Sequence, residues 1–166
     1  MKNLRTFLII TIGLIFVLLA GASIYAVLRD DDPYRSFTGL GESISVSPDD
    51  SKIAFSYYLD GEESIYIANP NGTHSKKITN PNNHRDRHPK YSPDSKQLVY
   101  LSKGPEGVQT LQVINEDGSK GRQLTDSEIH VTEAIFSKEG KSIFFVAMKA
   151  EDFNTGGEST GGFDLF

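Results

Sequence analysis

The chain has 166 residues, of which 37% are hydrophobic and 23% charged, a composition typical of a folded globular protein and unlike that of a disordered one. It contains no cysteine, which excludes disulfide bonds and thiolate metal sites. The net charge is −5, and because residues 1–29 contain three basic and no acidic residues, the rest carries −8, which argues against a nucleic-acid-binding protein.

Residues 7–28 form an uncharged, mostly apolar run of 22 residues. A helix of this length rises about 33 Å, which is enough to cross a hydrocarbon core of about 30 Å. Lys2 and Arg5 precede the run, so the positive-inside rule predicts a cytoplasmic N-terminus. We therefore predict a single-pass signal anchor in the cell membrane, with everything after residue 29 outside the cytoplasm. The alternative is a signal peptide that is cleaved near Ala22, which would yield a secreted protein.

A nine-residue pattern that opens with Ser-Pro-Asp begins at Ser47, returns at Ser92 and recurs in a weaker form at Ser137, with a constant spacing of 45 residues. Short alternating segments around each copy are separated by turn signals such as Asp60-Gly61. A period of about 40–45 residues built from short strands is typical of β-propeller blades.

The predicted fold is therefore all-β, with propeller blades of four antiparallel strands, about two and a half of them, after one N-terminal transmembrane helix. Propellers close with about four to eight blades, so we expect the sequence to be part of a longer protein, or alternatively to assemble with other chains. Residues 35–38 are predicted to complete the final blade. The predicted domains are the signal anchor 1–29, a linker and possible closing strand 30–41, blade 1 at 42–79, blade 2 at 80–125 and an incomplete blade 3 at 126–166.

Within the blades, alternation and turn signals predict eleven strands and one long Gly-rich loop at 149–162. The predicted strands are 43–46, 52–58, 64–69 and 76–79 in blade 1, 88–91, 97–102, 111–115 and 122–125 in blade 2, and 133–136, 142–148 and 163–166 in blade 3.

Four segments of blade 2 resemble the repeat of a known protein family: 88–94, Leu98-Val99-Tyr100, Asp117-Gly118 and 123–125. With their weaker counterparts in the other blades, they make residues 42–166 resemble the TolB-like β-propeller family. The resemblance implies an extracytoplasmic binding or scaffolding role without a cofactor. Similar blades also precede the catalytic domain of prolyl-oligopeptidase-like serine peptidases and occur in some pectin-degrading lyases.

One charged cluster is the most site-like feature, and it is predicted to lie in the loop between the fourth strand of blade 1 and the first strand of blade 2. In propellers such loops share a face with the loops that join second and third strands, and that face is the usual ligand surface. The candidate ligand-face residues are therefore His84, Arg85, Asp86, Arg87 and His88 together with Asp60, Glu62 and Glu63.

Two histidines and the aspartate of this cluster could supply ligands to a transition metal. A solvated loop with local ion pairs is the simpler interpretation, so no metal, cofactor or catalytic residue is predicted. His74 and His130 are predicted to be surface residues. Asp49 and Asp94 follow a proline in the repeated turn, where hydrogen bonding within the turn explains them better than catalysis does.

The sequence contains no Gly-x-Ser-x-Gly nucleophile motif and no phosphate-binding loop. It therefore predicts a non-enzymatic, membrane-anchored propeller that binds a protein or glycan ligand. The alternative is the propeller portion of a prolyl-oligopeptidase-like peptidase or a polysaccharide lyase whose catalytic part lies beyond residue 166.

Overall fold

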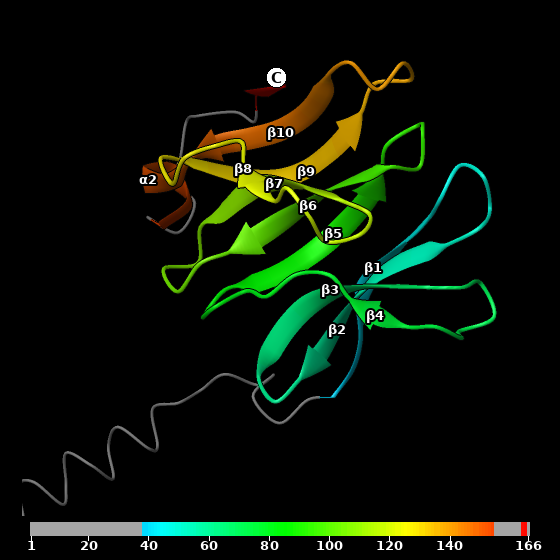
Figure 1. Cartoon of the computed structure of the whole chain (residues 1–166). Helices are drawn as coiled ribbons and strands as arrows, with labels where there is room; N and C mark the ends of the chain where they lie inside the picture. The colour runs from blue at the N-terminus through cyan, green and yellow to red at the C-terminus, as the bar shows by residue number, and fades with distance from the viewer. Residues whose placement is uncertain (1–37, 155–163, 166) are drawn as a thin grey trace, which may run out of the picture. The chain divides into compact units, whose positions relative to one another are not determined.

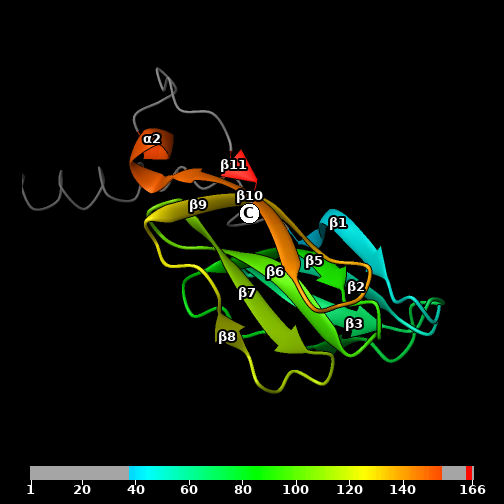
Figure 2. The ribbon, with the colours of Figure 1, turned by 90° about the horizontal axis from the view of Figure 1, so that it is seen from above.

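The computed structural model describes residues 38–154 and 164–165, and their strands form three blades that lie side by side in both views (Figures 1 and 2). Blade 1 contains β1 (Gly39–Val46), β2 (Ile53–Leu59), β3 (Glu62–Ala68) and β4 (Lys76–Lys77). Blade 2 contains β5 (Arg85–Tyr91), β6 (Gln97–Lys103), β7 (Gln109–Asn115) and β8 (Arg122–Gln123). Blade 3 contains β9 (Ile129–Phe136), β10 (Ile143–Lys149) and β11 (Asp164–Leu165), with the short helix α2 (Ala150–Asn154) between β10 and β11.

Neighbouring strands within each blade are antiparallel, and blades 1 and 2 are joined by a single parallel residue pair, Glu63 with Arg85. The all-β, propeller-like architecture predicted from the 45-residue period is therefore confirmed. In the part of the chain that the structure describes, the three blades do not close into a ring.

The structure contains every predicted strand from residue 39 onward, but the bounds of several strands and one loop differ from the prediction. β1 begins at residue 39 rather than 43, β5 at residue 85 rather than 88, and β9 at residue 129 rather than 133. β4 and β8 each end two residues earlier than predicted. The segment 149–162 was predicted to be an irregular loop, yet residues 150–154 form α2. Alternation of apolar residues marks only the part of a strand with one buried face, so the charged start of β5 escaped detection.

The repeated Ser-Pro-Asp segment is a turn that connects the first two strands of a blade. The Ser47 hydroxyl donates to the Asp49 carboxylate (2.6 Å) and accepts a hydrogen bond from the Lys52 backbone N–H (2.9 Å). Ser92 and Asp94 repeat the first of these contacts at 2.7 Å. Hydrogen bonds from the two neighbouring serines, Ser47 and Ser51, lower the pKa of Asp49 to about 2. The interpretation of Asp49 and Asp94 as turn residues is confirmed.

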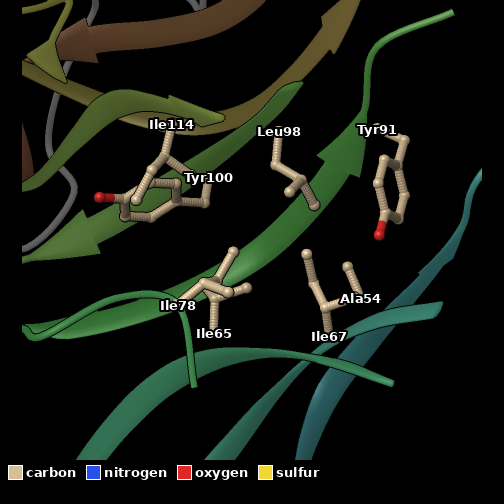
Figure 3. Packing of buried hydrophobic residues seen from close by; sticks show 8 residues of the cluster. All are labelled: Ala54, Ile65, Ile67, Ile78, Tyr91, Leu98, Tyr100 and Ile114. Carbon is tan, nitrogen blue, oxygen red and sulfur yellow. The ribbon is translucent and has the colours of Figure 1, made fainter. Parts of the chain in front are cut away.

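The apolar core lies between the blades. Ala54 and Ile65 of blade 1 face Leu98 and Ile114 of blade 2, and all four side chains are buried (Figure 3). A second cluster fills the space between blades 2 and 3 and includes Val99, Leu101, Leu111, Val131 and Phe136. At both contacts, the two neighbouring blades therefore present apolar faces to each other, as propeller packing requires.

The two outer faces of this stack are also apolar, but they are uncovered. Val46 on the outer face of blade 1 corresponds, 45 residues later, to the buried Tyr91. Phe144 on the outer face of blade 3 corresponds, 45 residues earlier, to the buried Val99. The exposed fractions are 67% for Leu40, 59% for Ile44, 52% for Val46, 58% for Ile135 and 47% for Phe144.

The predicted signal anchor and most of the predicted closing strand 35–38 lie outside the described residues. Among the described residues, no helix has both the length and the apolar character needed to cross a membrane. The anchor and the closing strand therefore stay predictions.

Candidate functional site

The charged cluster predicted as a site lies on a strand rather than in a loop, which corrects the expectation from the sequence. Arg85, Asp86, Arg87 and His88 all belong to β5, and only His84 precedes the strand. Backbone pairing with β6 fixes Arg85, Asp86 and Arg87, so their side chains project from a rigid element.

His88 occupies a β-bulge. The register of β5 against β6 shifts between Arg87 and Lys90, so that His88 and Pro89 lie opposite one residue of β6. His88 has a φ of 53°, in the left-handed region that residues with a side chain seldom adopt. Bulges redirect side chains and are common next to functional sites, and this observation therefore marks His88 as a candidate.

The first strand of each described blade carries a comparable irregularity. The register of β1 against β2 shifts between Leu40 and Ile44, and that of β9 against β10 shifts at Thr132. In the 45-residue repeat, His88 corresponds to Ser43 and Glu133. The three first strands therefore share a local break in register, and in β9 it falls at Thr132, one residue before the counterpart of His88.

Arg87 and Glu63 form an ion pair that links blade 2 to blade 1. The Arg87 Nη2 lies 2.7 Å from a Glu63 carboxylate oxygen and donates to the Tyr58 hydroxyl at 3.0 Å. The Glu63 side chain is only 2% exposed. Gly41 on β1 packs so closely that a Cβ atom there would overlap the Ser56 hydroxyl and approach Glu63. The pair is thus enclosed by the first three strands of blade 1.

Further cations lie close to this pair. Arg85 pairs directly across the β5–β6 ladder with Lys103, and like charges in that position repel each other. Burial lowers the pKa of Lys103, and the charges of Arg87 and Arg85 lower it further. Burial and the charge of Arg87 likewise lower the pKa of His88, so its imidazole is neutral near pH 7.

Asp86 has a different environment from its neighbours on β5. It is 3% exposed and accepts a hydrogen bond from the Ser102 hydroxyl at 2.7 Å. Burial raises its pKa, and hydrogen bonds from Ser102 and Thr79 oppose that shift. Since Thr79 in turn accepts a hydrogen bond from the Ile65 backbone N–H, Asp86 connects the end of blade 1 to blade 2. Its side chain is engaged in packing rather than directed to solvent.

The remaining candidates lie at the rim of the same end of the blades. The His84 ring would lie 3.5 Å from a Cβ atom at Gly104, beside the turn that joins β6 to β7. Asp60 lies in the β2–β3 turn, and the exposed Glu62 pairs with Lys77 at 3.3 Å. Glu63, beside the β2–β3 turn, pairs with Arg85 at the start of β5, so these two segments lie next to each other. We call this end of the blades the loop face, and it comprises residues 60–63, 80–88, 104–107 and 150–154.

His130 was predicted to be a surface residue, and this prediction is wrong. It is 3% exposed and stacks on the ring of Phe153, with a centroid separation of 3.7 Å. The predicted strand began at residue 133, so the position of His130 between Ile129 and Val131 was overlooked. The two apolar neighbours were the signal in the sequence that could have shown that β9 begins before residue 133. His74, by contrast, is exposed as predicted.

Within the described part of the chain, no three His, Asp or Glu side chains come together in a group that could hold a metal ion. The local reason is that Asp86 turns to Ser102, while the Nδ1–H of His84 donates to the Asn82 carbonyl at 3.0 Å. The loop face instead combines exposed carboxylates with half-buried cations, an arrangement suited to polar recognition of a ligand.

Comparison with solved structures identifies proteins with similar blades. TolB from Acinetobacter baumannii is similar over 80% of this chain and 30% of its own, with 22% identity and a TM-score of 0.60. The oligogalacturonate lyase from Vibrio parahaemolyticus is similar over 69% of this chain and 31% of its own, with 13% identity and a TM-score of 0.53. The acylaminoacyl peptidase of Pyrococcus horikoshii is similar over 70% of this chain and 19% of its own, with 15% identity and a TM-score of 0.53.

At these identities the similarity establishes the fold alone. The chain spans less than a third of the length of each of these three proteins. A comparison with curated protein sequences found no match.

The sequence also matches the model of a protein family over residues 29–162, which is most of the chain. The matched region contains blades 1 and 2 in full and blade 3 as far as α2. Together with the 45-residue repeat and the inter-blade packing, this match shows that the chain belongs to the TolB beta propeller domain family.

Proposed function

We propose that this chain is part of a non-enzymatic, extracytoplasmic propeller that binds a protein or glycan ligand on its loop face. The proposal rests on the ion pair of Arg87 and Glu63. Three further groups lie beside this pair on paired or bulged strands: Arg85, Lys103 and His88. Such groups are preorganised, so a ligand that contacts them loses little side-chain entropy from the protein on binding.

The test of this proposal is ligand capture by the full chain in detergent on peptide and glycan arrays. The variant D60K/E62K reverses two exposed charges on the loop face, and we expect it to weaken the wild-type array signals by about tenfold or more. The matched control is Lys141→Glu, whose side chain is 80% exposed in the β9–β10 turn at the opposite end of the blades. Signals lost in the control but kept in D60K/E62K would contradict the proposal.

A second candidate function is that of a propeller portion in a peptidase or a polysaccharide lyase, because similar blades occur in the acylaminoacyl peptidase and the oligogalacturonate lyase. Catalytic residues would then lie beyond residue 166. Turnover of a chromogenic peptide or of polygalacturonate by the full-length protein, together with unchanged array signals in D60K/E62K, would favour this candidate.

We also propose that residues 7–28 anchor the protein in the cell membrane, with the blades outside the cytoplasm. In cells, the wild-type protein is expected to stay in the membrane pellet after alkaline extraction, because a 22-residue apolar helix spans the bilayer. Deletion of residues 7–28 should move the protein to the soluble fraction. A mature N-terminus near Ala22, found by mass spectrometry, would instead identify a cleaved signal peptide.

We further propose that another blade packs against the outer face of blade 1 and another against that of blade 3, because both faces are apolar and uncovered. At the equivalent positions of the repeat, the packed blades bury Tyr91 and Val99. A face with the same composition gains a comparable hydrophobic free energy when it is covered, about 25 cal/mol for each Å² of apolar surface.

A further inference from the structure

Helix α2 replaces the tight turn that joins the second and third strands in the other blades. Those turns are short, with Asp60-Gly61 in blade 1 and residues 104–107 in blade 2. In blade 3 the chain leaves β10 directly into α2, and the Ala150 backbone N–H donates to the Glu128 carbonyl at 2.8 Å. Figure 1 shows α2 where β10 ends and β9 begins. α2 is therefore an additional structure on the loop face.

Phe153 holds α2 against two blades at once. Its ring stacks on His130 of β9 with a centroid separation of 3.7 Å and an interplanar angle of 14°. The same ring also approaches the β6–β7 turn of blade 2, where a Cβ atom at Gly107 would lie 3.6 Å from Phe153 Cε1. The stack thus fastens the helix to the junction between blades 2 and 3.

The surroundings of His130 favour its neutral form. The Gln109 backbone N–H donates to the imidazole Nδ1 at 3.3 Å, which requires an unprotonated nitrogen. The side chain is 3% exposed, and burial lowers its pKa, with a further contribution from the charge of Lys103. A protonated ring would lose the hydrogen bond and place a buried charge near a second cation.

Among the described residues, no carboxylate acts on this imidazole to offset that cost. From β7 it meets the neutral Gln109, whose amide Nε2 lies 3.5 Å from the ring Nε2. Its partner across the β9–β10 ladder is Met148. On α2 the carboxylate of Glu151 lies 3.5 Å from Lys149, and Asp152 follows it in the first turn. Lys103 is the charged group that acts on the imidazole, and it acts against protonation.

We propose that His130 and Phe153 form an acid-sensitive latch: protonation of His130 releases α2 from the loop face. The Gln109 hydrogen bond requires an unprotonated Nδ1, and burial of the ring beneath Phe153 disfavours its charged form, so docking of the helix and protonation of the histidine compete. Release would uncover the junction of blades 2 and 3 and detach α2, which lines a cavity of about 630 Å³ together with Ile129, Ala147 and Met148. The proposal holds whichever ligand the loop face binds.

The direction of the pH dependence follows from linkage. Because the docked state lowers the affinity of His130 for protons, docking is fully favourable above the ordinary imidazole pKa of about 6.5. As the pH falls below that value, the docking equilibrium constant decreases by up to about tenfold per pH unit until the docked form itself becomes protonated.

The absence of tryptophan from the chain provides a direct test. In the full chain in detergent, Phe153→Trp introduces a single indole at the stack. We expect its emission to shift to longer wavelength between pH 7 and pH 5, because the ring at this position, which stacks on His130 and is 40% exposed as phenylalanine, becomes fully exposed to water. The variant F153W/H130Q is the control: glutamine accepts the Gln109 hydrogen bond but does not titrate, so the emission should not change in this range.

Hydrogen exchange of the wild-type chain provides a second test, and its result does not depend on how well the tryptophan variant packs. After correction for the intrinsic pH dependence of exchange, residues 150–154 should lose about tenfold or more protection between pH 7 and pH 5. Peptides from β10 should keep theirs, and His130→Gln should abolish the difference. Quenching of the indole without a wavelength shift, or an equal loss of protection in His130→Gln, would overturn the latch.

Discussion

Arg87→Ala is expected to lower the free energy of unfolding by about 3–5 kcal/mol, because it leaves a buried carboxylate without its partner. The Glu63 side chain is 2% exposed, and its ion pair with Arg87 is 2.7 Å long. β1 packs closely against this carboxylate, since a Cβ atom at Gly41 would lie 2.9 Å from a Glu63 carboxylate oxygen. Chemical denaturation of the full chain in detergent, followed by far-UV circular dichroism, measures the loss.

Two further variants show whether the loss comes from the uncompensated charge. The double replacement E63Q/R87M removes both charges and is expected to recover most of the stability lost in Arg87→Ala, because no buried charge remains. Lys141→Ala removes one partner of the exposed pair with Glu139 and should change the unfolding free energy by about 0.5 kcal/mol or less. A comparably small effect of Arg87→Ala would contradict the buried ion pair.

Leu98→Ala should destabilise the fold by about 2–5 kcal/mol, because it creates a cavity between two blades. Leu98 is fully buried among Ile65, Ile114 and Tyr91 at the contact of blades 1 and 2 (Figure 3). Strand backbones hold these neighbours in place, so the site cannot collapse around the smaller side chain. The same denaturation experiment measures this effect.

The repeat supplies a matched control for this replacement. Ile53 occupies the position equivalent to Leu98 in blade 1, but it lies half-exposed on the uncovered outer face. Ile53→Ala should therefore cost about 1 kcal/mol or less in the full chain, since little apolar surface is returned to water. Equal losses for the two variants would contradict this expectation and show that the outer face of blade 1 is covered.

The strand-and-turn plan of the blades was predictable because its signals are local. The Asp60-Gly61 turn takes the positive φ values, 53° and 83°, that this dipeptide favours. The Ser-Pro-Asp turn closes through contacts between residues no more than five apart, as with Ser47 and Lys52. Where a segment carries no such pattern, as in α2 within a loop rich in glycine, the prediction from sequence was wrong.

The candidate site was predictable in part. The sequence indicated that residues 84–88 and 60–63 share one face, because propeller topology places those loops at the same end of the blades. It did not indicate that Asp86 turns into the blade contact or that His88 lies at a bulge. Those outcomes depend on the register of β5 against β6, which charged side chains do not specify.

By itself, the sequence determined the period, the order of strands and turns, and the family resemblance, because these depend on neighbouring residues and on a repeat of fixed length. Only the tertiary structure decided which polar groups meet across the blades. Glu63 reaches Arg87 across a blade boundary, and His130 is buried because Phe153 covers it from α2. Such contacts join residues more than 20 positions apart, and their energy comes from removing water between packed sheets, which no local pattern records.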